Sequence, residues 1–382
     1  MGVAKRQSAM NVTSQPDIIP VTLLTGFLGS GKSTLLSEIL RHSEFQNTAV
    51  IVNEFGEVGL DGVLIEHSEN QIIEMTSGCL CCTVRGDIRQ TLLMLHSKRE
   101  SGEIPQFDRV VVESTGLADP APVIHTLMSD RFLEHRFMLG GIVTTVDAAN
   151  GFSTIEKHKE CEKQVAVADR IVITKTDIKN IEISKEDIDG LRAKLSRLNP
   201  TAQIWDRHDG SLKFGNLFDT SLYDPGTKTI DVSKWLNAEA FPAEGDHHHH
   251  HHHYAEDGVA TEQNGGQHQH DVTRHGQNIR SFTLVLNQPV KIDTFATALE
   301  ALLFTQASQL LRIKGIVNTV DRPGRPMVIH GVQHIFHDPI WLEDWPDEDH
   351  RTKLVFITDG IERATLDEFF KSWISSSVGH WL

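Results

Sequence analysis

Three of the four cysteines in the chain lie within four positions, at Cys79, Cys81 and Cys82, and the fourth is Cys161. Adjacent cysteines are poor disulfide partners for each other, because their Cα atoms lie too close together. The cluster therefore favours metal or redox chemistry. Three thiolates and one further donor make up the tetrahedral ligand set that zinc prefers.

The cysteine cluster comes just before Asp87, a good N-cap for a helix predicted over 87–100. A helix N-terminus favours thiolates, so this position suits metal binding. The motif is expected to form a loop, and Glu54, Glu57 or water would complete the coordination. Two alternatives remain open: oxidation of neighbouring thiols, for which no thioredoxin-like context is present, and simple packing of small side chains.

A second motif, GFLGSGKS at 26–33, fits G-x-x-x-x-G-K-[ST] in full and lies between a predicted strand and a predicted helix. Its glycines let backbone N–H groups face phosphate oxygens, and the following helix adds its positive end. Lys32 is expected to reach the β- and γ-phosphates, and Ser33 to ligate Mg²⁺. The nucleotide-binding residues predicted here are Gly26, Gly29, Ser30, Gly31, Lys32, Ser33 and Thr34.

Two further segments follow at the ends of predicted strands. RVVVESTG (109–116) ends in Glu113, a candidate second Mg²⁺ ligand, and Gly116, whose N–H could approach the γ-phosphate. In TKTD (174–177), Asp177 could accept the two N–H donors of guanine while Lys175 lies along the base. The segment would thus select GTP, although Thr174 stands where many GTPases carry Asn. A local ion pair for Glu113 and a chance turn at TKTD are the alternatives.

The elements that position these segments are apolar strands alternating with helical patterns. This pattern is typical of parallel strands that are covered by helices on both faces, so we expect a doubly wound α/β fold of the P-loop type. The predicted strands are 21–26, 48–55, 109–115, 140–148 and 170–176, and the predicted helices include 32–42 and 87–100. The expected organisation is a flexible segment 1–17, a GTPase domain 18–206, a connecting region 207–278 and a C-terminal domain 279–382.

The C-terminal domain is predicted to be a smaller α+β unit with a mostly antiparallel sheet. Its expected strands are 281–290, 315–320, 326–336 and 353–359, and its helices are 292–311 and 364–374. A strand over 326–336 would place His330 and His334 on one face, and His337 follows; ordinary, partly buried histidines are the favoured interpretation of this group.

The connecting region is polar, lacks periodicity and holds a run of seven histidines. Imidazoles bind Zn, Ni, Cu or Co, so the run is a weak auxiliary metal site, with a functionless solvated insertion as the alternative. Its members are His247, His248, His249, His250, His251, His252 and His253.

Composition excludes several classes of protein. The net charge of −16 argues against a nucleic-acid partner, and no apolar run is long enough for a membrane span. The N-terminus lacks the apolar centre of a signal peptide, so a cytoplasmic location with reduced thiols is expected.

Taken in order, GFLGSGKSTLL, NEFGEVGLDG, GCLCC, ESTGLADPAPV and TKTD resemble the CobW-like family of P-loop GTPases, and RIKGIVNTV and IHGVQHIF resemble its C-terminal domain. The resemblance covers roughly 18–206 and 279–382. It implies that Cys79, Cys81 and Cys82 form the family's C-x-C-C metal motif. Two departures are Val52, where some relatives carry an extra Glu, and Ser114, where Thr is usual.

For function, the resemblance implies a metallochaperone that hydrolyses GTP and transfers zinc to a client protein. Glu54 and Glu57 match the family's NEFGE carboxylates, and Lys32, Glu54 and Glu113 are the expected catalytic residues. GTP, Mg²⁺ and Zn²⁺ are the expected ligands, with Co²⁺ or Ni²⁺ as alternatives. The client should dock on the C-terminal domain of a monomer or weak homo-oligomer. A cobalt or iron insertase, a His/Cys metal buffer and a P-loop kinase are the competing hypotheses.

Overall fold

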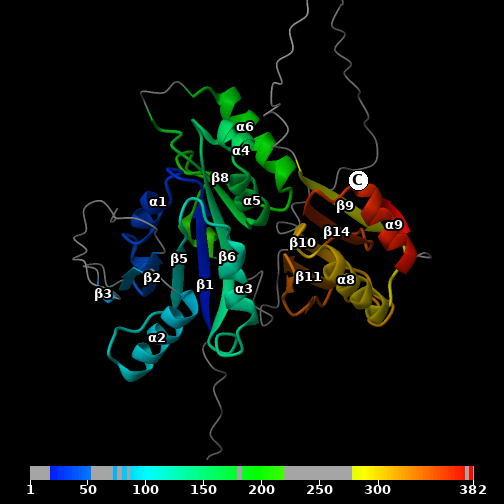
Figure 1. Cartoon of the computed structure of the whole chain (residues 1–382), viewed down its shortest axis with the longest axis horizontal. Helices are drawn as coiled ribbons and strands as arrows, with labels where there is room; N and C mark the ends of the chain where they lie inside the picture. The colour runs from blue at the N-terminus through cyan, green and yellow to red at the C-terminus, as the bar shows by residue number, and fades with distance from the viewer. Residues whose placement is uncertain are drawn as a thin grey trace, which may run out of the picture.

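The chain is described here by a computed structural model. The described residues are 18–52, 87–178, 183–218 and 278–374, with the backbone alone of 72–74, 80–83 and 378–381. Within this part the chain forms two sheets that lie side by side, each with its own helices (Figure 1). None of the described helices is both long and apolar enough to cross a membrane.

The first sheet has eight strands among the described residues, and all neighbours are parallel except β3 and β4. Its order across the sheet is β3 (Ile72–Glu74), β4 (Leu80–Thr83), β2 (Thr48–Val52), β5 (Arg109–Glu113), β1 (Ile19–Gly26), β6 (Phe137–Asp147), β7 (Arg170–Thr174) and β8 (Gln203–Asp206). This is the predicted doubly wound α/β fold, and it is confirmed.

Helices cover both faces of this sheet because its strands bury alternate residues on opposite sides. On β5, Val110 and Val112 pack in one apolar cluster with α2 and α3, while Val111 packs in another with α1. The helices are α1 (Lys32–Ile39), α2 (Ile88–Ser101), α3 (Ala121–Ser129), α4 (Gly151–Lys157), α5 (Lys159–Val167) and α6 (Lys185–Leu198), with 3-10 turns at η1 (Ser43–Phe45) and η2 (Phe214–Phe218).

The second sheet is antiparallel, as predicted. Its order is β12 (Ile335–Phe336), β11 (Met327–Val332), β10 (Leu310–Val317), β14 (Thr352–Asp359), β9 (Ile279–Leu286) and β15 (Val378–Trp381), with β13 (Ile340–Trp341) also paired to β11. One face carries α8 (Ile292–Gln306) and α9 (Arg363–Trp373), which lie away from the first domain in Figure 1.

The other face of the second sheet packs on the first domain. Leu311, Val332 and Val355 belong to the same buried cluster as Ala166 and Val167 at the end of α5. Because this apolar surface is shared, each domain completes the core of the other, and they are joined by more than a polar surface contact.

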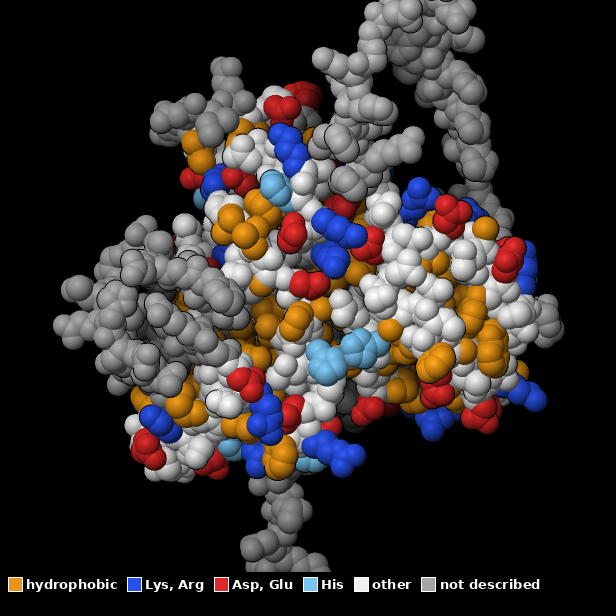
Figure 2. Space-filling view, viewed as in Figure 1, with side chains coloured by type: hydrophobic (Ala, Val, Ile, Leu, Met, Phe, Trp, Pro, Cys, Tyr) orange, Lys and Arg blue, Asp and Glu red, His pale blue; other side chains and the backbone are white. Residues whose placement is uncertain are grey.

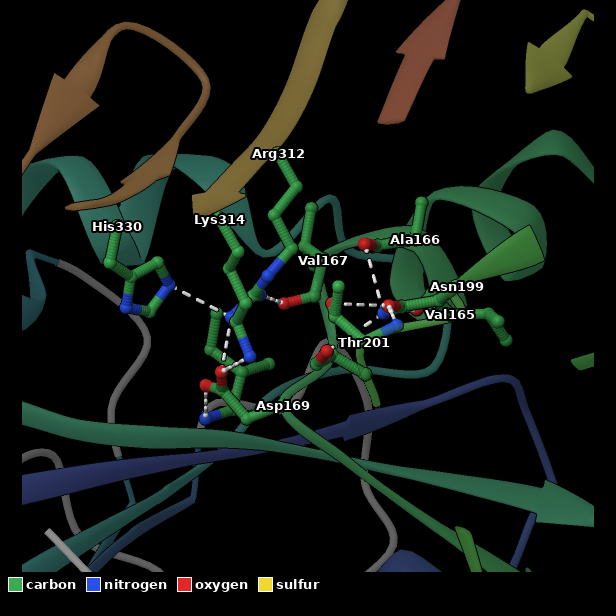
Figure 3. A network of polar contacts seen from close by, with 11 residues as sticks. Val165, Ala166, Val167, Asp169, Asn199, Thr201, Arg312, Lys314 and His330 are labelled. Carbon is green, nitrogen blue, oxygen red and sulfur yellow. Dashed lines mark hydrogen bonds and ion pairs between the residues drawn. The ribbon is translucent and has the colours of Figure 1, made fainter. Parts of the chain in front are cut away.

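A fully buried charge network lies within this junction (Figure 3). Asp169, just before β7, accepts hydrogen bonds from Arg312 and from the Ile142 N–H, and Lys314 lies 3.0 Å from the same carboxylate. Arg312 also donates to the carbonyl of Val167. Burial alone would raise the pKa of Asp169, but the two cations outweigh it and hold that pKa well below its ordinary value.

The segment that leads from α5 to Asp169 is fixed by one amide. Asn199, at the end of α6, donates from its side-chain nitrogen to the carbonyls of Val165, Ala166 and Ala168 at 2.9, 3.1 and 2.8 Å. The Val165 carbonyl also accepts from the Ala168 N–H at 3.2 Å, so the amide adds further hydrogen bonds where α5 ends. The start of β7 is therefore held in place both by α6 and by the second domain (Figure 3).

Several predictions about element type or extent were wrong. The helix predicted over 292–311 ends at Gln306, and β10 begins at Leu310, earlier than the predicted strand 315–320. Apolar pairs such as Leu310–Leu311 suit a buried strand as well as a helix, so periodicity alone could not separate them. The strand predicted over 326–336 is instead a hairpin, and His334 lies in the turn that joins β11 and β12.

Candidate functional site

The predicted phosphate loop connects β1 to α1 at the carboxyl edge of the first sheet. Gly26 has φ of 138°, a conformation that L side chains rarely adopt, and a Cβ there would lie 2.5 Å from the carbonyl oxygen of Thr145. Gly29 and Gly31 also have positive φ values of 71° and 90°. The loop therefore takes the tight path that its glycines predicted, close against β6.

The amine of Lys32 is folded back into this loop. Its Nζ donates to the carbonyls of Gly26 at 2.9 Å and Phe27 at 3.2 Å, and the residue is only 8% exposed. A phosphate could take over as its partner, because hydrogen bonds to an ionised acceptor are stronger than those to a neutral carbonyl. Ser30 and Thr34 are placed differently: Ser30 is buried and bonded to Thr145 at 2.6 Å, whereas Thr34 is exposed on α1.

The two residues predicted to hold Mg²⁺ are in direct contact. Ser33 Oγ donates to Glu113 Oε1 at 2.6 Å, joining the first turn of α1 to the end of β5. A hydroxyl and a carboxylate are the hard oxygen donors that Mg²⁺ accepts, usually together with water and phosphate oxygens. The residues present thus fit the ion.

Thr174, which stands where many GTPases carry Asn, is hydrogen-bonded to the phosphate loop. Its hydroxyl donates to the carbonyl of Ser30 at 2.7 Å, with a second contact to Val146 O at 3.2 Å. The side chain is buried and ties the end of β7 to the phosphate loop. The segment predicted to read guanine and the loop predicted to hold phosphates are therefore one connected unit.

Lys175 follows in the left-handed conformation, with φ of 62°, and its Nζ lies 2.7 Å from Asp147 Oδ2. Burial opposes ionisation of Asp147, but hydrogen bonds from Lys175, the Ala149 N–H and Asn150 outweigh it and lower its pKa. Asp177 is exposed and pairs with His208 at 3.1 Å. Its carboxylate is accessible to a base at this edge.

A cavity of about 250 Å³ opens beside the phosphate loop and Lys175. Its walls come from the loop, from the end of β6, and from α4 and α5. The lining residues include Phe27, Gly29, Asp147, Asn150, Cys161 and Lys175. Burial raises the pKa of the Cys161 thiol to about 12, which disfavours the reactive thiolate.

Gly116 lies directly against the phosphate loop. A Cβ at this position would come within 2.6 Å of the Leu28 backbone nitrogen, so only glycine allows the approach. Gln164, a buried residue of α5, donates to the carbonyls of both Gly116 and Ala118 at 3.1 Å. Leu28 and Leu117 are large apolar residues exposed beside this contact.

The metal motif is placed only in part. Cys81 and Cys82 lie in β4, where the backbone of Cys81 pairs with Val50 and that of Cys82 with Ile51. The expectation of a cysteine loop is therefore wrong for these two residues, which form an inner strand between β2 and β3. Asp87 does cap α2, accepting from the Arg89 N–H at 2.9 Å. Outside the described residues lie Cys79, Glu54, Glu57 and the histidine run 247–253.

The C-terminal histidines do not share a strand face, because the hairpin turn separates them. His330 is buried on β11 with its Nε2 2.8 Å from Arg312, and its ring lies 5.1 Å from that of His337. His334 is exposed in the turn. Among the described residues, no group of three or more histidine, cysteine or acidic side chains is arranged to hold a metal.

Several residues of this edge were not identified from the sequence. Asp147 and Thr145 lie at the carboxyl end of β6, and that position at the end of a buried parallel strand was a usable signal. Gln164 and His208 carried none, since their partners are distant in sequence. The same holds for the junction residue Asp169.

Comparisons with known proteins agree with this geometry. The CobW/HypB/UreG nucleotide-binding domain matches residues 20–206, and the cobalamin synthesis protein cobW C-terminal domain matches 279–374. The chain is 34% identical to the zinc chaperone YjiA of Escherichia coli over 89% of this chain and 93% of that protein. It is 29% identical to the zinc chaperone CobW of Pseudomonas aeruginosa, over 91% and 89% respectively.

Among solved structures, the crystal structure of Zn(II)-bound YjiA GTPase from Escherichia coli superimposes with a TM-score of 0.67 at 32% identity, covering 93% of this chain and 99% of that one. The similarity extends through both domains, and the identity is high enough to carry more than the fold. The chain therefore belongs to the CobW family of P-loop proteins.

Proposed function

We propose that this protein is a zinc chaperone that hydrolyses GTP and uses the nucleotide to control zinc bound at Cys79, Cys81 and Cys82. The relatives named above are called zinc chaperones, and a further relative at 28% identity, from Schizosaccharomyces pombe, is called zinc-regulated GTPase metalloprotein activator 1. In this proposal zinc is the cargo, with Co²⁺ or Ni²⁺ as alternatives, and Glu54 or Glu57 completes its coordination.

The observation that carries the nucleotide half of the proposal is the Ser33–Glu113 contact of 2.6 Å. It joins the phosphate loop to the strand that leads into Gly116, and Thr174 joins the same loop to the guanine-reading segment at 2.7 Å. The residues proposed to bind a Mg-nucleotide therefore meet at one edge of the sheet.

In the proposed mechanism, Lys32 exchanges its two carbonyl partners for the β- and γ-phosphates when GTP binds. Ser33 and Glu113 would hold Mg²⁺, which would neutralise charge on the phosphates. Asp177 would accept from the guanine N1–H and N2–H₂ groups. The N–H of Gly116, already against the phosphate loop, would contact the γ-phosphate and lose that contact after hydrolysis.

The strand register gives a route from phosphate to metal. Val52 of β2 is level with Glu113 of β5 on one side and with Thr83 of β4 on the other. Two interstrand spacings separate β4 from β5, which is roughly 10 Å. The backbone of Cys81 and Cys82 is thus close enough to β5 for γ-phosphate binding to alter metal coordination, and coupling of this kind acts in both directions.

A client protein would receive the ion. We place its docking surface on the C-terminal domain, which packs tightly on the GTPase domain and would sense its state through the shared core. Slow intrinsic hydrolysis is expected until the client binds, since no arginine finger is assigned within the described residues.

Nucleotide turnover tests the enzymatic half of the proposal. We expect Mg²⁺-dependent release of phosphate from GTP, with ATP used much more slowly, and loss of this preference in Asp177→Ala. A matched control is Asp209→Ala. Asp209 is an exposed aspartate whose carboxylate accepts a hydrogen bond from the Ser211 N–H. Equal use of GTP and ATP by the unaltered protein would refute the guanine assignment, and a preference for ATP with phosphate transferred to something other than water would favour a kinase.

A further inference from the structure

Two histidines from different domains lie side by side on the surface. His125 is exposed on α3 of the first domain, and His334 is exposed in the turn between β11 and β12 of the second. Their ring centroids are 5.0 Å apart with an interplanar angle of 46°. Figure 2 shows histidine side chains together at the place where α3 meets the β11–β12 hairpin.

We propose that His125 and His334 form a second transition-metal site, separate from the cysteine motif, that binds a divalent ion across the junction of the two domains. The chemical class is an imidazole-seeking ion such as Ni²⁺, Cu²⁺ or Zn²⁺. The site does not depend on the proposed GTPase activity.

The spacing of the rings suits a shared ion. A metal–nitrogen bond of about 2.0–2.1 Å and a tetrahedral angle place the centroids of two imidazoles on one ion roughly 5 Å apart. The observed centroid distance is 5.0 Å, so small rotations of the side chains would suffice. Exposure allows the rings to turn and leaves the remaining positions to water.

Both histidines stand on fixed supports. On α3, Ile124 and Leu127 are buried in the apolar cluster, which holds the helix and leaves His125 beside that buried face. The hairpin that carries His334 is closed by pairing of Val332 with Ile335. Its other turn residue, Gln333, has a φ of 53° and donates its N–H to Leu311 O at 3.1 Å.

The neighbouring histidine pair does not meet the same conditions. His330 and His337 have ring centroids 5.1 Å apart, nearly the same separation. However, His330 is buried and lies 2.8 Å from the guanidinium of Arg312, whose positive charge opposes a metal ion. The exposed pair is therefore the one available to a cation from solution.

The arrangement has a consequence for the fold. No third histidine, cysteine or acidic ligand joins the pair among the described residues, so the ion would keep water ligands and exchange readily. Because the two ligands come from different domains, an ion bound by both favours the docked arrangement by mass action. The site would thus report or reinforce domain docking when metal is abundant.

Histidine footprinting on the full chain tests this proposal, with diethylpyrocarbonate as the reagent and Ni²⁺ or Zn²⁺ alone as the probe. We expect the modification rates of His125 and His334 to fall together by about fivefold or more, because one ring nitrogen of each histidine becomes a metal ligand. His135, with 77% of its side chain exposed, serves as an internal control whose rate should not change.

Two variants show whether one ion bound by both histidines protects them from the reagent, or whether each histidine is protected by an ion of its own. In His334→Gln, metal should no longer protect His125, and in His125→Gln it should no longer protect His334, whereas Cys81→Ser should leave both protected. If His125 is protected equally well in His334→Gln, or if neither residue is protected at about 1 mM free metal, the site does not exist.

Discussion

The nucleotide edge and the domain junction both hold charged side chains, but they hold them in different ways. At the edge, Lys32 and Ser33 are bonded to groups that a ligand could replace, at 2.9 and 2.6 Å. At the junction, Asp169 is fully buried against Arg312 and Lys314, and both cations are about 1% exposed. One set of bonds can be exchanged, and the other is closed to solvent.

This difference separates function from assembly. A charge that must bind a substrate is held by weaker partners that the substrate can replace. A charge that joins two domains is paired permanently, because a buried ion without its partner is very costly. Strand β7 connects the two regions, since Asp169 lies just before it and Thr174 ends it. Substitutions at the junction should therefore affect the stability of the fold, and substitutions at the edge should affect the binding and turnover of nucleotide.

The largest effect is expected from Asp169→Ala. This change leaves the Arg312 cation buried without its carboxylate, which should lower the free energy of unfolding by about 3–5 kcal/mol. Denaturant unfolding measures it. Asp367→Ala removes a surface carboxylate paired with Lys371 and should cost at most about 1 kcal/mol. Similar losses in the two variants would show that the buried ion pairs of the junction contribute no more to stability than a surface pair.

Lys32→Ala should produce the reverse pattern. We expect GTP turnover to fall by roughly 10²–10³-fold, because a charge aimed at the developing phosphate charge is lost, with little change in the melting temperature. Lys194→Ala, which breaks the ion pair between α6 and Glu156 of α4, should leave turnover intact. A fully active Lys32→Ala protein would remove the phosphate loop from the mechanism.

Lys314 gives the junction a dependence on pH. Burial and the neighbouring Arg312 lower the pKa of Lys314 from 10.5 to about 7, although Asp169 partly opposes them. Between these two values the unfolded chain binds more protons than the folded chain, so stability rises with pH. From pH 7 to pH 9 the gain should be about 2 kcal/mol. In Lys314→Met this pH-dependent gain in stability should vanish. If the stability of the variant depended on pH as that of the unaltered protein does, the lowered pKa of Lys314 would be contradicted.

A smaller effect is expected from Thr174→Val, which removes the bond to Ser30 O but keeps the shape of the side chain. The buried carbonyl has lost a partner, so stability should fall by about 1–2 kcal/mol and GDP should bind more weakly. Thr174→Ser keeps the hydroxyl and should restore both the stability, measured by denaturant unfolding, and the GDP affinity, measured by calorimetric titration. Equal binding by the Val and Ser variants would mean that the tether is unimportant.

The nucleotide edge could be predicted well from the sequence because its signals are local. Buried parallel strands appear as apolar runs, and the residues that end them, such as Glu113 and Thr174, must share one edge of the sheet. The strand ends were placed a few residues too far along, at 115 and 176 instead of Glu113 and Thr174.

The domain junction could not be predicted, since its pairs join residues more than 100 positions apart. One signal was present: Arg312 and Lys314 alternate with apolar residues in LLRIKG, and such a pattern on a strand puts both cations on one face. The helix predicted over this segment concealed it. Cys81 and Cys82 were expected in a loop because a four-residue strand gives too short a period to recognise.

The central claim is that nucleotide controls zinc at the cysteine motif, and zinc titration of the protein loaded with GDP or with a non-hydrolysable GTP analogue tests it most directly. We expect zinc affinity to differ by about tenfold or more between the two states. The difference should disappear in Cys81→Ser and persist in Cys161→Ser, which alters a buried thiol of α5 outside the cysteine motif, in the wall of the cavity beside the phosphate loop. Equal affinities in both nucleotide states, or an undiminished difference in Cys81→Ser, would contradict the account.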